Sequence, residues 1–279
     1  QTSLEGVADR VQAVQAVVRE LLARTQQSKV DAVAIGATGY FMRGKALREQ
    51  VPPMMFKTHG ARTVLMCSDM LSAYAGALGL EAGAVIAAGT GAVALGSDLR
   101  GTWSRVDGWG YLVGDFGGGS WIGRTALQAA LRCADGRPGG SELLLAALRD
   151  HFGEPTEMVA DLALREDRAG AMAGFVPFVE RAAPDDEIAR GILSDAGAHL
   201  AETALAALVP GSARVIAMTG NLFRVNAVRS SFAKAVGERA ELRKAAGSGV
   251  DGALALAAAA IEGTLPLNAP CELFTSPFR

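Results

Sequence analysis

The chain has 279 residues, half of them hydrophobic, and a formal net charge of -2 at pH 7. This length and composition suit one large domain or two smaller ones with a sizeable core. The near-neutral charge and the scattered Lys and Arg residues argue against a nucleic-acid-binding surface, which needs clustered basic residues. No apolar run reaches the length of about 18 residues typical of a membrane-spanning helix, so we expect no membrane partner.

The cysteines Cys67, Cys133 and Cys271 are far apart in the sequence, and no CxxC pair is present. This spacing argues against a structural zinc site or a disulfide framework. Free thiols and the lack of a signal-peptide pattern predict a cytoplasmic protein. The chain starts with Gln1 rather than Met, so we expect the natural start to lie upstream.

Apolar periodicity and turn residues predict alternating helices and strands. In chain order we expect a helix over 4–24, a strand at 32–35, a helix from 45 that ends at Pro52-Pro53, a strand over 62–67, a helix over 71–78, a hairpin of 83–88 with 92–96, a loop over 101–120, helices between 121 and 161, two helical stretches near 168–182 and 186–208, a strand over 214–218 and a last helix over 250–262. This alternation indicates an α/β fold, and the helix-rich middle indicates a second lobe.

Three glycine clusters are candidate phosphate or ligand loops. The first, Gly39 to Ala46, nearly matches a P-loop, but Ala46 stands where the magnesium-binding hydroxyl belongs, so an ordinary strand–helix connection is favoured. The second, Gly89-Thr90-Gly91, can turn backbone N–H groups toward an anion, with a plain hairpin turn as the alternative.

The third cluster runs from Gly108 to Trp121 and is both glycine-dense and aromatic. We interpret it as an ordered binding loop in which Trp109 stacks on a sugar ring and Asp115 accepts hydrogen bonds from sugar hydroxyls. The alternative is a structural Ω-loop with the tryptophan packed inward.

The order of these segments resembles the BadF/BadG/BcrA/BcrD-type ATPases, a group that includes N-acetylglucosamine and glucosamine kinases of the actin/Hsp70/hexokinase superfamily. The resemblance covers nearly the whole chain. It implies two RNase H-like lobes around a cleft: an N-terminally incomplete first lobe over 1–82, a helix-rich second lobe over 83–250, and a C-terminal helix and tail over 251–279 that return to the first lobe. Gly252-Ala253 would lie in the hinge helix.

The resemblance also implies ATP- and Mg²⁺-dependent phosphorylation of a small-molecule amino sugar at its primary hydroxyl, and it leaves a homodimer open. The residue roles that it implies are a catalytic base and sugar contact at Asp69, a phosphate loop at Gly89, Thr90 and Gly91, sugar contacts at Trp109 and Asp115, and nucleotide contacts at Gly220 and Asn221. From the residues alone, Asp69 has another interpretation, as the N-cap of the helix that follows it.

Two departures from the family pattern bear on substrate and activity. Phe116 and Gly118 stand where the family often has Glu and Ser, which puts the exact sugar in question. No segment matches the family's Asp-Gly-Gly-Gly-Thr-like opening hairpin, so we expect a fragment, unrecorded upstream residues or a pseudo-kinase, and the metal ligands stay unassigned. Two other functions stay open: an activator-type ATPase that drives electron transfer, and a non-catalytic sugar-binding regulator.

Overall fold

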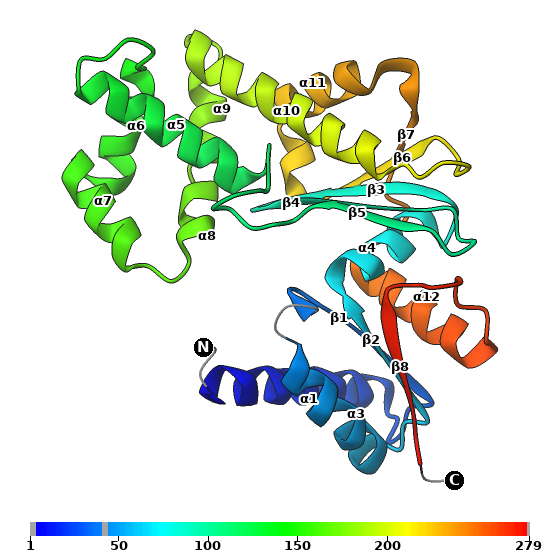
Figure 1. Cartoon of the computed structure of the whole chain (residues 1–279). Coiled ribbons are helices and arrows are strands. Elements are labelled where there is room, and N and C mark those ends of the chain that lie inside the picture. The colour runs from blue at the N-terminus through cyan, green and yellow to red at the C-terminus, as the bar shows by residue number, and fades with distance from the viewer. Residues whose placement is uncertain (1–3, 41–43, 278–279) are drawn as a thin grey trace. The chain divides into compact units, whose positions relative to one another are not determined.

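The computed structural model of the chain describes residues 4–40 and 44–277, with side chains described from residue 11 onward. It is a mixed α/β structure with one three-stranded and one five-stranded sheet (Figure 1). The chain divides into two compact units. Unit 1 contains Gln1–Glu81, Leu99–Trp103 and Ala245–Arg279, and unit 2 contains Ala82–Asp98 and Ser104–Lys244. Each unit therefore combines stretches that are separated in the sequence.

The sheet of unit 1 has the strand order β1-β2-β8. Strands β1 (Ala32–Ala37) and β2 (Thr63–Ser68) run parallel, and β8 (Cys271–Thr275) runs antiparallel to β2. Parallel neighbours need a crossover, which α3 (Lys45–His59) supplies. Helices α1 (Leu4–Thr25), α4 (Asp69–Leu78) and α12 (Gly249–Glu262) complete the unit.

Alternation along the strands divides the side chains of this sheet between two faces. Val64 and Met66 of β2 join a core with α1 and α3, to which Val18, Leu22, Leu47, Val51 and Met55 contribute. The opposite face packs against α4 and α12. Both faces of the sheet are thus covered, as is usual for parallel strands.

Helix α3 continues through Pro52 and Pro53, so the expected end of the helix at these residues is wrong. The two prolines remove two N–H donors from the helix. Leu47, Val51 and Met55 lie four residues apart and are all buried, which places one continuous apolar stripe across the proline pair. Burial of this stripe outweighs the lost hydrogen bonds, and the helix ends at Gly60 in the left-handed conformation.

Helices α4 and α12 touch backbone to backbone at two glycines. A Cβ added to Gly76 would lie 1.9 Å from the carbonyl oxygen of Ser248, and one added to Gly252 would lie 1.9 Å from that of Ser72. Only glycine permits such an approach. This contact returns the chain to unit 1 after unit 2 is complete.

The sheet of unit 2 has the strand order β5-β4-β3-β6-β7. Strands β3 (Gly83–Ala88) and β4 (Ala92–Ser97) form the expected antiparallel hairpin. Strand β6 (Val215–Thr219) runs parallel to β3 and to β7 (Glu241–Lys244), and β5 (Trp103–Asp107) adds an edge beside β4.

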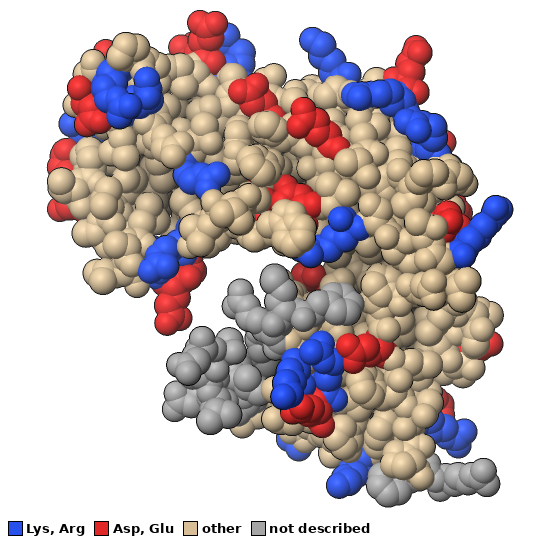
Figure 2. Space-filling model, viewed as in Figure 1, with Lys and Arg blue, Asp and Glu red and all other residues tan. Residues whose placement is uncertain are grey.

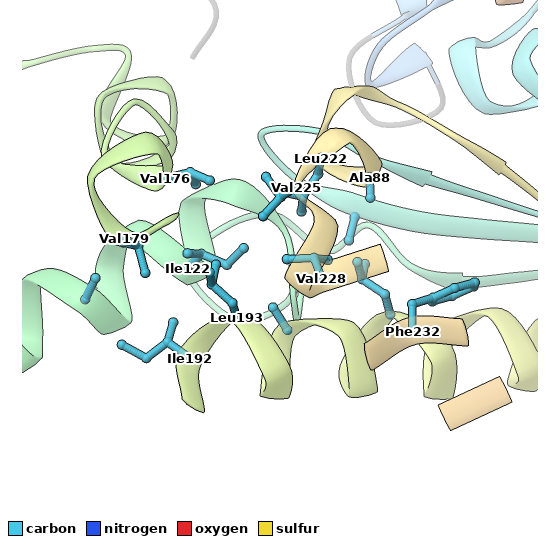
Figure 3. Close-up of a cluster of buried hydrophobic side chains, with 14 of the residues drawn as sticks. Ala88, Ile122, Val176, Val179, Ile192, Leu193, Leu222, Val225, Val228 and Phe232 are labelled. Atoms are coloured by element: carbon cyan, nitrogen blue, oxygen red, sulfur yellow. The ribbon is translucent and has the colours of Figure 1, made fainter. Parts of the chain in front are cut away.

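The helices of unit 2 share one hydrophobic core with the sheet. Figure 3 shows part of it, where Ile122, Leu193 and Val228 point toward one another from three different helices. The helical elements of unit 2 are α5 (Gly119–Ala134), α6 (Glu142–Phe152), α7 (Pro155–Leu164), α8 (Arg168–Ala173), α9 (Val176–Ala182), α10 (Glu187–Ala207), α11 (Asn226–Val236) and the 3₁₀ turns η1 (Asn221–Arg224) and η2 (Gly237–Arg239).

Several further elements differ from the sequence-based expectations. The expected loop over 101–120 contains β5, and the short strands β7 and β8 were not expected at all. Helix α4 starts at Asp69 rather than at 71, and the stretch near 168–182 is split into α8 and α9 at Gly174. The missed strands are edge strands of four or five residues, too short to show a periodic pattern.

Lys and Arg side chains are scattered among Asp and Glu side chains on the face seen in Figure 2, and the formal net charge is -2. Among the described residues, no helix has the length and apolar character that a membrane crossing would require.

Candidate functional site

Asp69 lies where β2 passes directly into α4 in unit 1. The N-cap of α4 is Ser68, whose Oγ accepts a hydrogen bond from the backbone N–H of Leu71 at 3.3 Å. Interpreting Asp69 as this N-cap is therefore wrong. Its exposed carboxylate instead accepts a 2.6 Å hydrogen bond from the hydroxyl of Thr38, which follows β1. The carboxyl ends of two parallel strands thus bring these two side chains together.

The first turn of α4 is held tightly behind this carboxylate. Ser72 donates its hydroxyl to the backbone carbonyl of Asp69 at 2.8 Å. A Cβ added to Gly36 of β1 would lie 2.4 Å from the same Ser72 oxygen, so a larger residue there would displace this hydroxyl. The sheet and the turn therefore fix where the Asp69 backbone lies.

The Gly89-Thr90-Gly91 turn rests on the start of α5 in unit 2. The N–H groups of Gly119 and Ser120 donate to the carbonyls of Gly89 and Thr90, each at 2.8 Å. A Cβ added to Gly118 would lie 2.8 Å from the backbone carbon of Gly91. The two glycine clusters are thus stacked backbone to backbone, and this contact gives the physical reason for Gly118 where the family often has Ser.

Asp115 reaches the same turn. A Cβ added to Gly91 would lie 2.3 Å from Asp115 Oδ2, so the carboxylate occupies the space beside that glycine. Its Oδ1 accepts the N–H of Gly110 at 3.2 Å. Burial raises the pKa of Asp115, and nearby backbone N–H groups oppose the rise. The predicted sugar contact and the predicted phosphate turn are therefore direct neighbours.

Trp109 is on the surface, with 66% of its area exposed. An inward-packed tryptophan, the alternative interpretation of this loop, is thus wrong. The Arg105 guanidinium lies 5.0 Å from the centre of the indole ring and holds it by a cation–π contact. Leu112 and Val113 of the same loop are also exposed. The loop presents an apolar surface on which a ring could stack.

Phe116 packs its ring against His199 of α10, with ring centres 5.7 Å apart. The side chain at this position thus contacts α10, where the resemblance would place a carboxylate for the sugar.

Asp107 is a site residue that sequence reasoning missed. It is only 7% exposed, and its two carboxylate oxygens accept the N–H groups of Asp115 at 2.7 Å and Phe116 at 2.9 Å. This clamp closes the loop from 107 to 116 and fixes the Asp115 backbone, which has a positive φ of 57°. The position directly before Gly108 was the available signal, but a contact eight residues ahead cannot be read from local pattern.

Gly220 brings the end of β6 against the end of β3. Its φ of 101° is unfavourable for any side chain, and an added Cβ would lie 2.1 Å from the carbonyl oxygen of Ala88. Asn221, exposed at the start of η1, follows directly. Because Ala88 precedes Gly89, the predicted nucleotide contacts lie beside the predicted phosphate turn.

Asp69 thus belongs to unit 1, whereas the other predicted site residues belong to unit 2 and gather around one turn. Part of the P-loop-like stretch, residues 41–43, lies outside the described residues. Gly44 after them caps α3 without a side-chain hydrogen bond. Among the described residues, no three His, Cys, Asp or Glu side chains are grouped as metal ligands.

Solved structures share this fold. A chain from Chromobacterium violaceum, provisionally assigned as an N-acetylglucosamine kinase, superimposes with a TM-score of 0.73 at 26% identity, over 90% of this chain and 86% of that one. A ROK family glucokinase from Streptomyces griseus, in complex with glucose and AMPPNP, gives a TM-score of 0.53 at 18% identity, over 92% and 88% of the two chains. The fold is therefore that of the actin/hexokinase-like sugar kinases.

Curated relatives match over shorter segments. The chain is 35% identical over 74 residues to an N-acetylmuramic acid/N-acetylglucosamine kinase of Clostridium acetobutylicum, which is 26% of this chain and 24% of the relative. It is 43% identical over 53 residues to an N-acetyl-D-glucosamine kinase of Dictyostelium discoideum, 19% of this chain and 17% of the relative. The matched part thus spans about a quarter or less of these relatives.

The sequence model of one protein family matches residues 1–257, which is most of the chain. This match agrees with the two-sheet fold and with the glycine-stacked turn of unit 2. The chain belongs to the BadF/BadG/BcrA/BcrD ATPase family.

Proposed function

We propose that the chain is an ATP-dependent sugar kinase that phosphorylates an amino sugar, N-acetylglucosamine or glucosamine, at its primary hydroxyl. The observation that carries the proposal is Asp69, an exposed carboxylate at the carboxyl end of a parallel strand. Its helix is already capped by Ser68, so capping does not account for the acidic side chain.

Asp69 has the geometry of a general base. The Thr38 hydroxyl bonds to Oδ2 and orients the carboxylate, which leaves Oδ1 to accept the proton of a sugar hydroxyl as that hydroxyl attacks the terminal phosphate. Phosphoryl transfer needs positioning and charge stabilisation more than covalent chemistry by the protein. A fixed turn that aims one carboxylate supports this role.

The glycine turn of unit 2 supports a nucleotide role. Gly89 has open space where a Cβ would be, although its neighbours Gly91 and Gly118 are closely packed. A turn that is rigid on one side and open on the other can approach phosphate with its backbone. Gly220 and Asn221 beside it would contact the nucleoside.

Mg²⁺ would supply charge neutralisation on the triphosphate of the bound nucleotide. Because the described residues hold no group of three acidic, His or Cys ligands, we assign it no protein ligands. Mg²⁺ in kinases is commonly held by phosphates and water with one or two carboxylates, which is compatible with this arrangement.

Two observations favour an amino sugar as the acceptor. The two curated relatives are kinases of N-acetylglucosamine, one of them also of N-acetylmuramic acid, and the Chromobacterium violaceum chain is provisionally assigned the same activity. The exposed Trp109 and the clamped Asp115 lie in one loop and combine a stacking surface with a hydrogen-bond acceptor, as sugar sites require.

A coupled assay of ADP release over a panel of sugars tests the proposal. We expect turnover with N-acetylglucosamine or glucosamine to exceed that with glucose, and the phosphate to appear on the primary hydroxyl of the product by NMR. The assay uses the full natural chain with ATP and Mg²⁺. Equal turnover of glucose and the amino sugars would contradict the proposed specificity.

The same panel separates the other functions. Sugar binding without ADP release would indicate a regulatory protein. Iron in the purified protein, with ATP hydrolysis independent of any sugar, would indicate an activator-type ATPase.

Replacing Trp109 by Ala is expected to raise the KM for sugar about fivefold or more and to leave the KM for ATP nearly unchanged, because ring stacking contributes on the order of 1 kcal/mol. Leu164→Ala is the control, since Leu164 is 86% exposed at the end of α7, outside this loop, and the change should leave both KM values unchanged. A rise in the KM for ATP alone would assign the loop to the nucleotide instead.

A further inference from the structure

Two of the three cysteines, separated by most of the sequence, lie directly opposite each other in the sheet of unit 1. Cys67 of β2 pairs with Cys271 of β8 in the antiparallel register. Both belong to unit 1, and neither has a role in the proposed transfer reaction. Cys67 is buried at 1% exposure and Cys271 is half-buried. Their spacing in the sequence gave no sign of this pairing.

The hydrogen bonds of the ladder identify the kind of pair. The N–H of Ser276 donates to the carbonyl of Arg62 at 2.8 Å, which makes that pair a hydrogen-bonded one. Hydrogen-bonded and non-hydrogen-bonded pairs alternate along an antiparallel ladder. Counting along the register from Arg62 makes Cys67 and Cys271 a non-hydrogen-bonded pair.

A second observation agrees with this assignment. The N–H of Cys271 donates to the carbonyl of Ala269 at 2.7 Å, and so it is not used for a bond to β2. In non-hydrogen-bonded pairs the Cα atoms are about 4.5 Å apart and the side chains on the shared face are at their closest. Disulfides need a Cα separation of about 4.4–6.8 Å.

We propose that Cys67 and Cys271 form a cross-strand disulfide when the protein meets a small-molecule disulfide oxidant, and that this bond anchors the edge strand β8. A covalent link would stabilise this strand in particular, because β8 has only five residues and pairs with β2 on one side. Such a strand frays more easily than the strands inside a sheet.

The chemistry is ordinary thiol–disulfide exchange. The thiolate of Cys271 attacks one sulfur of R–S–S–R and releases RS⁻. Cys67 then loses its proton to solvent and attacks the Cys271 sulfur of the mixed disulfide, releasing the second RS⁻. The two cysteines are oxidised to one cystine by two electrons, and one oxidant molecule is reduced to two thiols.

The electrostatic surroundings support slow and selective exchange. Burial raises the pKa of Cys67 to about 12, with the neighbouring Cys271 adding to the rise. Burial also raises the pKa of Cys271, and Glu272 contributes. Both cysteines therefore stay protonated and reduced in a thiol-rich solution, and oxidation takes place on the scale of minutes to hours.

The test uses the folded full chain with Cys133 replaced by Ser, so that only the pair remains. After incubation with oxidised glutathione we expect the intact mass to fall by two hydrogens and a cross-linked peptide joining residues 63–68 to 271–275. The melting temperature should rise by about 5 °C or more over the reduced form, and amide exchange in β8 should slow. Reduction by dithiothreitol should reverse each change.

Cys271→Ser in the same background is the control, because this position lies at the sheet edge and is only half-buried. It should retain the reduced melting temperature and form no cross-link. Two results would overturn the proposal: a stable glutathione adduct on Cys271 without cross-linking, or a cross-link that forms only after unfolding in urea. Neither measurement uses kinase activity, so the outcome is independent of the proposed function.

Discussion

Replacing Asp69 by Asn is expected to lower kcat by about 10²- to 10⁴-fold, the usual contribution of a general base. Asn has the same size and can still accept the Thr38 hydroxyl, but it cannot take the proton of the attacking sugar. Ser68 remains the N-cap, so the helix start does not depend on residue 69. The dissociation constant for sugar, measured by calorimetry, should change less than about tenfold.

Thr38→Val provides a graded comparison for this experiment. It removes the hydrogen bond to Asp69 and keeps the carboxylate, so it should lower kcat by less than Asp69→Asn does. Melting temperatures should stay close to wild type for both variants. An unchanged kcat in Asp69→Asn would remove Asp69 from the mechanism. A joint collapse of kcat and melting temperature would make the residue structural.

Replacing Asp107 by Ala should destabilise unit 2 by about 3 kcal/mol, because two partly buried N–H groups lose their charged acceptor. The acceptor oxygens lie 2.7 Å and 2.9 Å from the nitrogens of Asp115 and Phe116, and the side chain is 7% exposed. A loss of this size lowers the melting temperature by roughly 6–12 °C. The loop should also loosen, which would change the fluorescence of Trp109 and raise the KM for sugar.

Two further variants test whether the loss of stability comes from the two hydrogen bonds of Asp107 or from the loss of a negative charge in general. Asp107→Asn keeps one oxygen acceptor and should lose about half as much stability. Asp195→Ala, at an exposed position on α10, should leave both readouts unchanged. Equal melting temperatures for Asp107→Ala and wild type would show that the two N–H groups find other partners. The claim that Asp107 stabilises the loop would then be wrong.

The strands that are apolar along their length could be predicted from the sequence. The strands that form only because they pair with an adjacent strand were missed. β1, β2, β3, β4 and β6 are short apolar runs, and all five lie close to where the sequence placed them. β7 has the sequence Glu-Leu-Arg-Lys, and only pairing with β6 makes it a strand. Pairing of this kind brings together residues far apart in sequence, which no local pattern encodes.

The site residues divide in the same way, into those that the sequence made visible and those that depend on how the chain folds. Gly91, Gly118 and Gly220 were conspicuous as glycines. In the structure Gly118 and Gly220 each have a close backbone neighbour, and Gly91 has the Asp115 carboxylate beside it. The capping role of Ser68 was not visible, because Ser and Asp are both good N-caps and only the helix start decides between them. Asp107 was missed because its hydrogen bonds depend on how a ten-residue loop closes.

The interrupted sequence of unit 1 has a consequence for synthesis on the ribosome. Unit 2 is fully translated at Lys244, when α12 and β8 have not yet been made. The edge of β2 that later pairs with β8 stays unpaired until about 200 further residues have been translated, which takes roughly 10–40 s at ordinary translation rates. During this interval the nascent chain carries an unpaired strand edge and the face of α4 that α12 will cover, both of which chaperones recognise. Strands β1 and β2 and helix α4 of unit 1 therefore complete their packing only after unit 2 has been translated.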